Sequence, residues 1–136
     1  MKSIFVTGGA GFIGSHTCLM LLEKGLTLFI LDSFVTSSQK SLQKVSLILS
    51  KKAIDTKDRI FVIKGDIKNL YDIERVFEMS FALKKRIEAV MHFAGLKAVG
   101  DSVKDPLSYW ENNVNGTINL LKIMAKHNCK NIVFSS

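Results

Sequence analysis

The chain has 136 residues, of which 47% are hydrophobic and 23% charged, and its 19 Lys and Arg against 12 Asp and Glu give a formal charge of +7. This length fits one domain, and the apolar fraction excludes a disordered chain because it suffices for a hydrophobic core. No apolar run reaches the roughly 18 residues of a membrane-spanning helix, so we expect no membrane association.

Short β-rich runs alternate with stretches of helical periodicity along the whole chain. The β-rich runs predict strands over 3–7, 26–31, 59–64, 89–94 and 132–135. The stretches between them predict helices over 12–24, from an N-cap at Ser37 or Ser38 through Leu49, over 69–86, and from Pro106 to about Asn128. Segment 26–31 (LTLFIL) is continuously apolar, which is typical of a strand covered on both faces.

Five strands that alternate with helices predict an α/β fold with a parallel sheet covered on both faces. Right-handed crossover connections favour the strand order 3-2-1-4-5, as in a doubly wound sheet of the Rossmann type. We expect residues 1–136 to form one such domain, which stops after its fifth strand.

The cysteines and the excess positive charge do not point to a metal or nucleic-acid site. Cys18 and Cys129 lie far apart and have no His or Cys neighbours at metal-ligand spacing, so we expect no metal, no disulfide framework and a cytoplasmic location. Lys51, Lys52 and the run 84–86 fall where we expect helices to end, and cations there complement the helix dipole. Binding to a phosphate backbone is the lesser alternative, and we expect no nucleic-acid partner.

A glycine cluster follows the first predicted strand and precedes the first helix. It reads GGAGFIG over 8–14, so Gly8, Gly11 and Gly14 recur every three residues. Glycine allows a tight turn, close approach of a pyrophosphate and close packing of helix on strand, while the helix N-terminus presents amide groups to an anion. Ordinary tight turns also use glycine, so the cluster alone leaves nucleotide binding open.

An acidic residue at the end of the second strand supports the nucleotide hypothesis. Asp32 lies 18 residues after Gly14, close to the spacing at which a carboxylate accepts the ribose hydroxyls of a dinucleotide. It would repel a 2′-phosphate, which favours NAD over NADP as the cofactor. The alternative role for Asp32 is a strand-end cap. Asp66 follows the third strand and could bind the adenine amino group, although a turn is the simpler role for Gly65-Asp66.

Residues near the end of the fourth strand could line the same ligand. Residues 93–95 (FAG) permit close approach of the backbone, and Lys97 could supply a cation, although a solvated loop lysine is the simpler interpretation. His92 lies within the strand, where a hydrogen-bonded core histidine is expected more often than a base.

The long C-terminal helix contains residues that are unfavourable inside helices. Asn112, Asn113 and Gly116 have poor helix propensity, and the glycine costs about 1 kcal/mol relative to alanine. They suggest a ligand contact or the close approach of another surface. Simple exposure is the alternative.

Four segments together resemble one enzyme family. They are VTGGAGFIGSH over 6–16, HFAGLKAVGDS over 92–102, NNVNGT over 112–117 and VFSS over 133–136. In these segments the chain resembles the UDP-glucose 4-epimerases, which are extended short-chain dehydrogenases/reductases. The resemblance covers the whole chain and is looser between Ser37 and Arg59.

The resemblance implies NAD as cofactor and assigns residues to it. The implied cofactor-binding residues are Gly8, Gly11, Phe12, Ile13, Gly14, Asp32, Ser33, Phe34, Val35, Thr36, Ser37, Asp66, Ile67, Phe93, Ala94, Gly95, Lys97 and Asn112. It further implies a UDP-hexose substrate, a 4-keto intermediate in galactose metabolism, and a homodimer in the full-length family.

The catalytic pattern of the family is missing from these residues. The family uses a Tyr-x-x-x-Lys pair with a serine, but here Tyr71 precedes Arg75 and Tyr109 precedes Asn113 at that spacing. Residues 135–136 match only the first two members of a serine run whose third member is the catalytic one. We therefore predict that the chain by itself does not epimerise sugars and assign it no catalytic residue.

Two alternatives remain open at this point. The chain could be a module that binds NAD or a partner without catalysis. It could also belong to another nucleotide-sugar dehydratase or reductase, which the segment around Lys97 disfavours.

Overall fold

The computed structural model describes residues 2–34, 37–94 and 104–135. Within these ranges five parallel strands form one sheet in the order β3-β2-β1-β4-β5. The strands are β1 (Ser3–Thr7), β2 (Thr27–Asp32), β3 (Ile60–Lys64), β4 (Ile87–His92) and β5 (Ile132–Phe134). The helical elements are α1 (Phe12–Glu23), α2 (Gln39–Lys51), α3 (Leu70–Ala82), α5 (Pro106–Trp110), the π-helical turn η1 (Glu111–Asn115) and α6 (Gly116–Lys126). The predicted doubly wound α/β fold and its strand order are confirmed.

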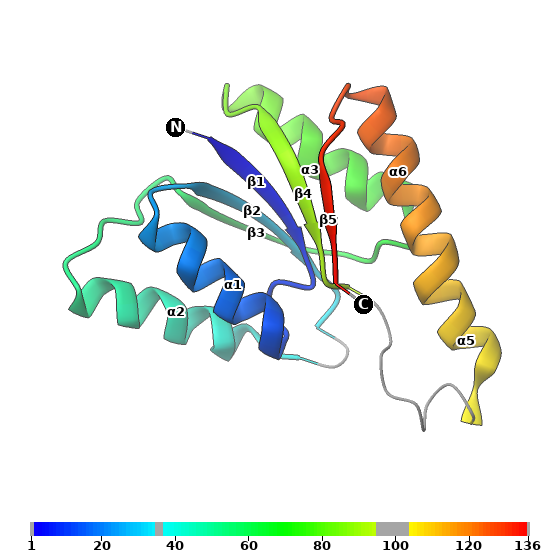
Figure 1. Cartoon of the computed structure of the whole chain (residues 1–136), viewed down its shortest axis with the longest axis horizontal. Helices are drawn as coiled ribbons and strands as arrows, with labels where there is room; N and C mark the ends of the chain where they lie inside the picture. The colour runs from blue at the N-terminus through cyan, green and yellow to red at the C-terminus, as the bar shows by residue number, and fades with distance from the viewer. Residues whose placement is uncertain (1, 35–36, 95–103, 136) are drawn as a thin grey trace.

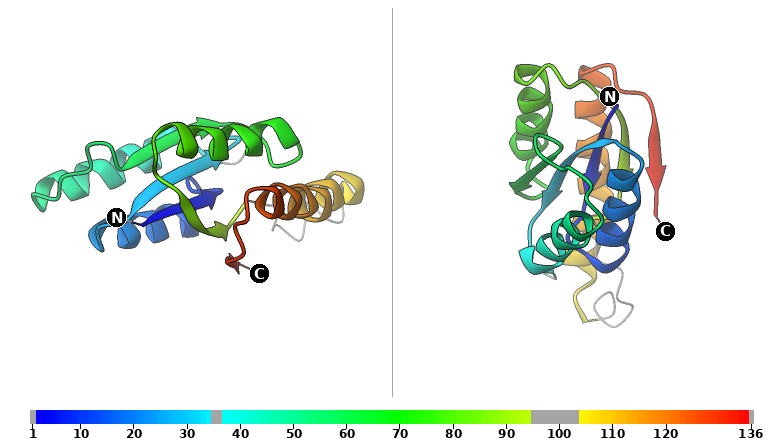
Figure 2. Two further views of the ribbon diagram at one scale, coloured as in Figure 1. Left: turned by 90° about the horizontal axis from the view of Figure 1, so that it is seen from above. Right: turned by 90° about the vertical axis from the view of Figure 1, so that its left-hand side faces the viewer.

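The helices cover the sheet on both faces. Helices α1 and α2 lie on one face, and α3 and α6 lie on the other (Figures 1 and 2). Each of the strands β1 to β4 is followed by a helical segment that returns the chain to the start of the next strand, as right-handed crossovers require. All the carboxyl ends of the strands therefore lie along one edge of the sheet.

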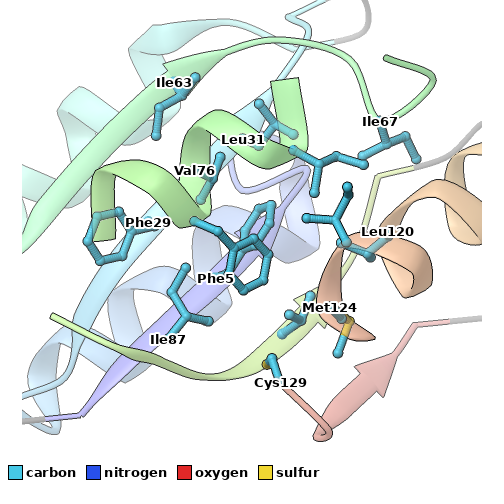
Figure 3. Packing of buried hydrophobic residues seen from close by; sticks show 14 residues of the cluster. Phe5, Phe29, Leu31, Ile63, Ile67, Val76, Ile87, Leu120, Met124 and Cys129 are labelled. Carbon is cyan, nitrogen blue, oxygen red and sulfur yellow. The ribbon is translucent and has the colours of Figure 1, made fainter. Parts of the chain in front are cut away.

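Alternate residues of the central strands supply two separate hydrophobic cores. Phe5, Phe29 and Leu31 pack with residues of α3 and α6 in the cluster that Figure 3 shows. Val6 and Ile30, one residue along each strand, pack instead against α1 and α2. All six residues of β2 are buried, as its continuous apolar sequence predicted. Each fully buried side chain of this size contributes roughly 1.5–3 kcal/mol.

The third helix is shorter than its sequence predicted. We expected it to run over 69–86, but α3 ends at Ala82, and Lys84 adopts a left-handed conformation with φ of 56°. The Lys85 amide donates to the Ser80 carbonyl at 2.9 Å, which closes a Schellman motif and turns the chain toward β4. The cations at 84–86 therefore follow the helix, which corrects their predicted place inside its last turn.

A polar contact joins α3 to the end of α6 across one face. Glu74 Oε1 lies 2.7 Å from His127 Nε2, and Lys126 Nζ lies 3.3 Å from Glu74 Oε2. The His127 ring stacks on Phe77 at a centroid distance of 4.8 Å. Burial by itself would raise the pKa of Glu74, but the hydrogen bond from His127 and the positive charge of Lys126 outweigh it and hold that pKa below its ordinary value.

We expect Glu74→Gln to lower the free energy of unfolding by roughly 1–3 kcal/mol at pH 7, because a charge-assisted contact is lost. A carboxyl whose pKa is depressed by folding stabilises the protein above its unfolded pKa of about 4.3 and loses that effect as pH falls through the folded value. Urea titrations of both proteins should therefore differ at pH 7 and converge below about pH 4. An equal difference at both pH values would contradict this assignment.

None of the helices in the described ranges is long and apolar enough to cross a bilayer.

Candidate dinucleotide-binding site

The candidate site lies along the edge where the parallel strands end. Thr7, Asp32 and His92 are the last residues of the three central strands β1, β2 and β4, so they lie near one another at this edge. In Figure 1 the arrowheads of β1, β4 and β5 converge at this edge, next to the C-terminus. Open parallel sheets bind ligands at this edge.

The glycine loop between β1 and α1 is closely packed on both sides. Gly8 has φ of +70°, and a Cβ there would lie 2.6 Å from the Ala94 amide nitrogen. A Cβ on Gly14 would overlap the Gly8 carbonyl oxygen. Two of the three glycines are thus required by the protein's own packing. Gly11 is different, because the nearest atom to its added Cβ lies 3.4 Å away, so only a ligand would require glycine there.

The N-terminus of α1 presents amide groups without a side-chain cap. Gly11 is the N-cap and offers no side-chain acceptor, and the first turn contains no acidic residue. By contrast, α2 and α3 are capped by Ser38 and Asn69. The first amides of a helix have no partner within the helix, so an anion at α1 would meet both free donors and the helix dipole.

Two large apolar side chains flank this helix start and are left in solvent. Phe12 is 81% exposed and Ile13 is 54% exposed. Both were assigned to the cofactor, and their exposure leaves them free to cover a ligand at the N-terminus of α1.

Asp32 holds the glycine loop in place. Its Oδ2 accepts the Ala10 amide at 2.9 Å, and its Oδ1 accepts the Phe34 amide at 2.8 Å and the Ser37 hydroxyl at 3.1 Å. The strand-end cap that we considered is therefore one real role of this carboxylate. A carboxylate has about four acceptor positions, so Oδ2 keeps capacity for a ligand hydroxyl.

The negative charge of Asp32 also affects a buried thiol. Cys18 lies below the glycine loop, where burial, with a smaller contribution from the Asp32 charge, raises its pKa to about 12. The Cys18 thiol is therefore unreactive and acts as a packing residue. In the described ranges no cluster of His, Cys, Asp or Glu could hold a metal ion.

After β3, Asp66 and Ile67 have structural partners. Asp66 Oδ1 accepts the Lys68 amide at 2.9 Å, which is the turn that the Gly-Asp sequence suggested. Ile67 is 4% exposed and packs in the core, where Gly116 allows α6 to approach it. This contact explains the glycine inside the long helix. The Ile67 side chain therefore faces the core, so only its backbone is left to face a ligand.

The fourth strand ends in a network of buried polar groups. Phe93 and Ala94 donate their amides to Thr7 Oγ1 at 3.1 and 3.2 Å. His92 is 2% exposed and lies 2.6 Å from Thr7 Oγ1 through its Nδ1 atom. The expectation of a hydrogen-bonded core histidine is confirmed.

Some assigned residues lie outside what the structure describes. They are Val35, Thr36, Gly95 and Lys97, together with the side chain of Asn112.

Three residues that position the site were not singled out from the sequence. Ser41 Oγ donates to the Ala10 carbonyl at 2.6 Å and fixes the glycine loop from α2. Asn119 Nδ2 donates to the Ile67 and Lys68 carbonyls, and Thr7 binds the turn after β4. The available signal was a polar residue in an otherwise apolar strand or helix face. Such residues are common for reasons unrelated to a binding site, so this signal is not specific.

Comparison with known proteins identifies the family. The model of the GDP-mannose 4,6 dehydratase family matches residues 5–136. The chain belongs to this family. Within the family its relatives include a UDP-glucose 4-epimerase of Oryza sativa subsp. japonica, 51% identical over 98% of the chain, and one of Schizosaccharomyces pombe, 43% identical over 98% of it.

Solved structures of the family superpose well on this fold. UDP-glucose 4-epimerase from Bifidobacterium longum, in complex with NAD+ and UDP, has a TM-score of 0.85 at 42% identity over 99% of this chain. The Thermus thermophilus enzyme in complex with NAD has a TM-score of 0.80 at 30% identity over 99% of it. The chain spans 34% of the two curated relatives and 37% of each of the two solved chains.

Proposed function

We propose that the chain is the NAD-binding part of a UDP-glucose 4-epimerase. The observation that carries this proposal is the uncapped N-terminus of α1 beside a glycine loop, with Asp32 at the end of the adjacent strand. The resemblance to enzymes crystallised with NAD supports the same ligand. In this proposal residues 1–136 form the cofactor domain, and the nucleotide-sugar domain lies outside them.

In this proposal, different segments along the carboxyl edge of the sheet bind different parts of NAD. The amides at the start of α1 bind the pyrophosphate, and Gly11 lets it approach the backbone. Asp32 accepts the adenosine ribose hydroxyls through the free capacity of Oδ2, and Phe12 covers the pyrophosphate from solvent. Phe93 and Ala94 line the cofactor farther along the edge, together with Asn112.

The substrate and the assembly belong to the whole protein. Hydride removal from carbon 4 of a UDP-hexose, rotation of the 4-keto sugar and return of the hydride would require the catalytic residues that these 136 residues lack. The exposed Leu107 and Trp110 on α5 offer apolar area for a homodimer through the long helix. The free buried thiols Cys18 and Cys129 fit a cytoplasmic enzyme.

We expect calorimetric titration of the folded chain with NAD to show binding, and incubation with UDP-galactose and NAD to yield no UDP-glucose. A folded sample that gives no heat with NAD would refute the cofactor assignment. Measurable conversion of UDP-galactose to UDP-glucose would refute the proposal that the catalytic residues lie outside these 136 residues. The relative from Schizosaccharomyces pombe, assayed in parallel, is the positive control for turnover, and the Bifidobacterium longum enzyme is the control for NAD binding.

A further inference from the structure

We propose that His92, as the neutral Nε2–H tautomer, is a positioning residue that locks the Phe93–Ala94 turn to the π-helical turn η1. This inference rests on the proposed function, because both segments would line the cofactor. It assigns to a buried histidine a task other than proton transfer.

The hydrogen-bond capacity of Thr7 fixes one side of the ring. Thr7 Oγ1 accepts the Ala94 amide and shares the Phe93 amide with the Thr7 carbonyl, so its acceptor positions are occupied by donors. A hydroxyl has one proton to donate, and among the described residues His92 Nδ1, at 2.6 Å, is the acceptor that Thr7 Oγ1 contacts. His92 Nδ1 therefore carries no hydrogen.

The other side of the ring gives the same answer. The Thr117 hydroxyl donates to the Asn113 carbonyl at 2.8 Å. Having donated its only proton, Thr117 Oγ1 can meet His92 Nε2 at 3.1 Å only as an acceptor. His92 Nε2 therefore carries the hydrogen, and every proton in the chain from Thr7 to Asn113 is oriented in one direction.

The network ends on an irregular part of the long helix. Residues 111–115 form the π-helical turn η1, where the Gly116 amide bonds to the Glu111 carbonyl. Single π-helical turns displace side chains from the regular helix path and are frequent at functional sites. The Thr117 hydroxyl, held by His92, fixes the Asn113 carbonyl of that turn.

Burial makes the network rigid and sensitive to the protonation state. His92 is 2% exposed and Thr7 is fully buried, and Phe134 packs edge-on against the imidazole at a centroid distance of 4.8 Å. Gly8 lies against the backbone of Phe93 and Ala94, so the same network aligns the glycine loop with the turn after β4. A buried polar chain of this kind costs energy if one member loses its partner.

The tautomer is tested without any ligand. In a long-range ¹H–¹⁵N spectrum of the labelled chain at neutral pH, we expect Nδ1 of His92 as the acceptor nitrogen and Nε2 as the protonated nitrogen. The signals of the two His92 ring nitrogens are assigned by their absence from the spectrum of His92→Gln, which lacks the ring. The Nδ1–H tautomer or a doubly protonated ring would overturn the proposal, whether or not NAD binds.

The positioning role is tested by NAD affinity. We expect Thr117→Val to weaken NAD binding about tenfold, and Thr117→Ser, which keeps the hydroxyl, to remain within about twofold of the parent. Val45→Ala, in the opposite core, is the matched destabilised control and should leave the affinity unchanged. Thr117→Val with parental affinity would overturn the positioning role. Absence of NAD binding by the parent chain would instead remove the proposed function, while the tautomer measurement would still decide the network.

Discussion

Gly8→Ala is expected to lower the free energy of unfolding by about 2–5 kcal/mol. An alanine at φ of +70° costs about 1–2 kcal/mol in backbone strain. Its Cβ would also press on the backbone of Phe93 and Ala94, which cannot rotate away as a flexible side chain would, and such overpacking costs typically 1–3 kcal/mol. Because small domains have only about 5–15 kcal/mol of stability, this one methyl group should remove a large part of it.

Gly25→Ala is the matched control for this substitution. Gly25 has φ of +88°, but no atom lies within 4 Å of the position that its Cβ would take. Gly25→Ala should therefore cost only the strain, about 1–2 kcal/mol. Urea denaturation with an unchanged m-value measures both effects. Equal losses for the two variants would show that the contact between the glycine loop and the Phe93–Ala94 turn contributes nothing.

The ends of the helices show why their boundaries were harder to predict than their existence. Hydrophobic periodicity located each helix, because it reflects the face that each helix buries. All of α1, α2, α3 and α6 end in a Schellman motif, but only α1 places a glycine, Gly25, in the left-handed position. Ala53, Lys84 and Asn128 take that position in the others. Alanine and lysine give no sequence signal for it, so the predicted C-terminal end of α3 lies four residues beyond Ala82.

The site could be predicted where one residue type has one physical role. The glycine spacing predicted a tight turn between the first strand and the first helix, and Asp32 was expected at the end of the second strand; both lie at those places in the structure. The supporting contacts could not be predicted, because they join residues far apart in the chain. Ser41 reaches the Ala10 carbonyl across 31 residues, and the proton on His92 is set by hydroxyls 85 and 25 residues away.

The π-helical turn η1 in the long helix is another feature that could not be predicted from the sequence. Asn112, Asn113 and Gly116 suggested a ligand contact or the close approach of another surface, and the structure explains the glycine by its contact with Ile67. The sequence predicted one continuous helix from Pro106 to about Asn128, whereas the structure has α5, the π-helical turn η1 and α6, which ends at Lys126. The contact that reaches this turn from another element is that of His92 Nε2 with Thr117 Oγ1 at 3.1 Å, which joins residues 25 positions apart and leaves no local pattern in the sequence.

Asp32→Asn is expected to reduce the ratio of NAD affinity to NADP affinity at least tenfold. The carboxylate accepts ribose hydroxyls through charge-assisted hydrogen bonds, each of which contributes about 1.5–3 kcal/mol, so NAD binding should weaken about 10- to 100-fold. The same negative charge repels the 2′-phosphate of NADP, and asparagine removes that repulsion. NADP should therefore lose much less affinity than NAD, or gain some.

The ratio separates the two roles that the structure gives to Asp32. If Asp32 only capped β2 and held Ala10, the amide would loosen the glycine loop and weaken both cofactors by the same factor, because they share the pyrophosphate. Asp58→Asn is the control for charge, since Asp58 is exposed in the loop before β3 and asparagine tolerates its φ of 59°. Isothermal titration of the three proteins with both cofactors gives the ratio directly. An unchanged ratio in Asp32→Asn would leave the carboxylate with its structural role alone, since a group that contacts the ribose cannot lose its charge without changing how the two cofactors are distinguished.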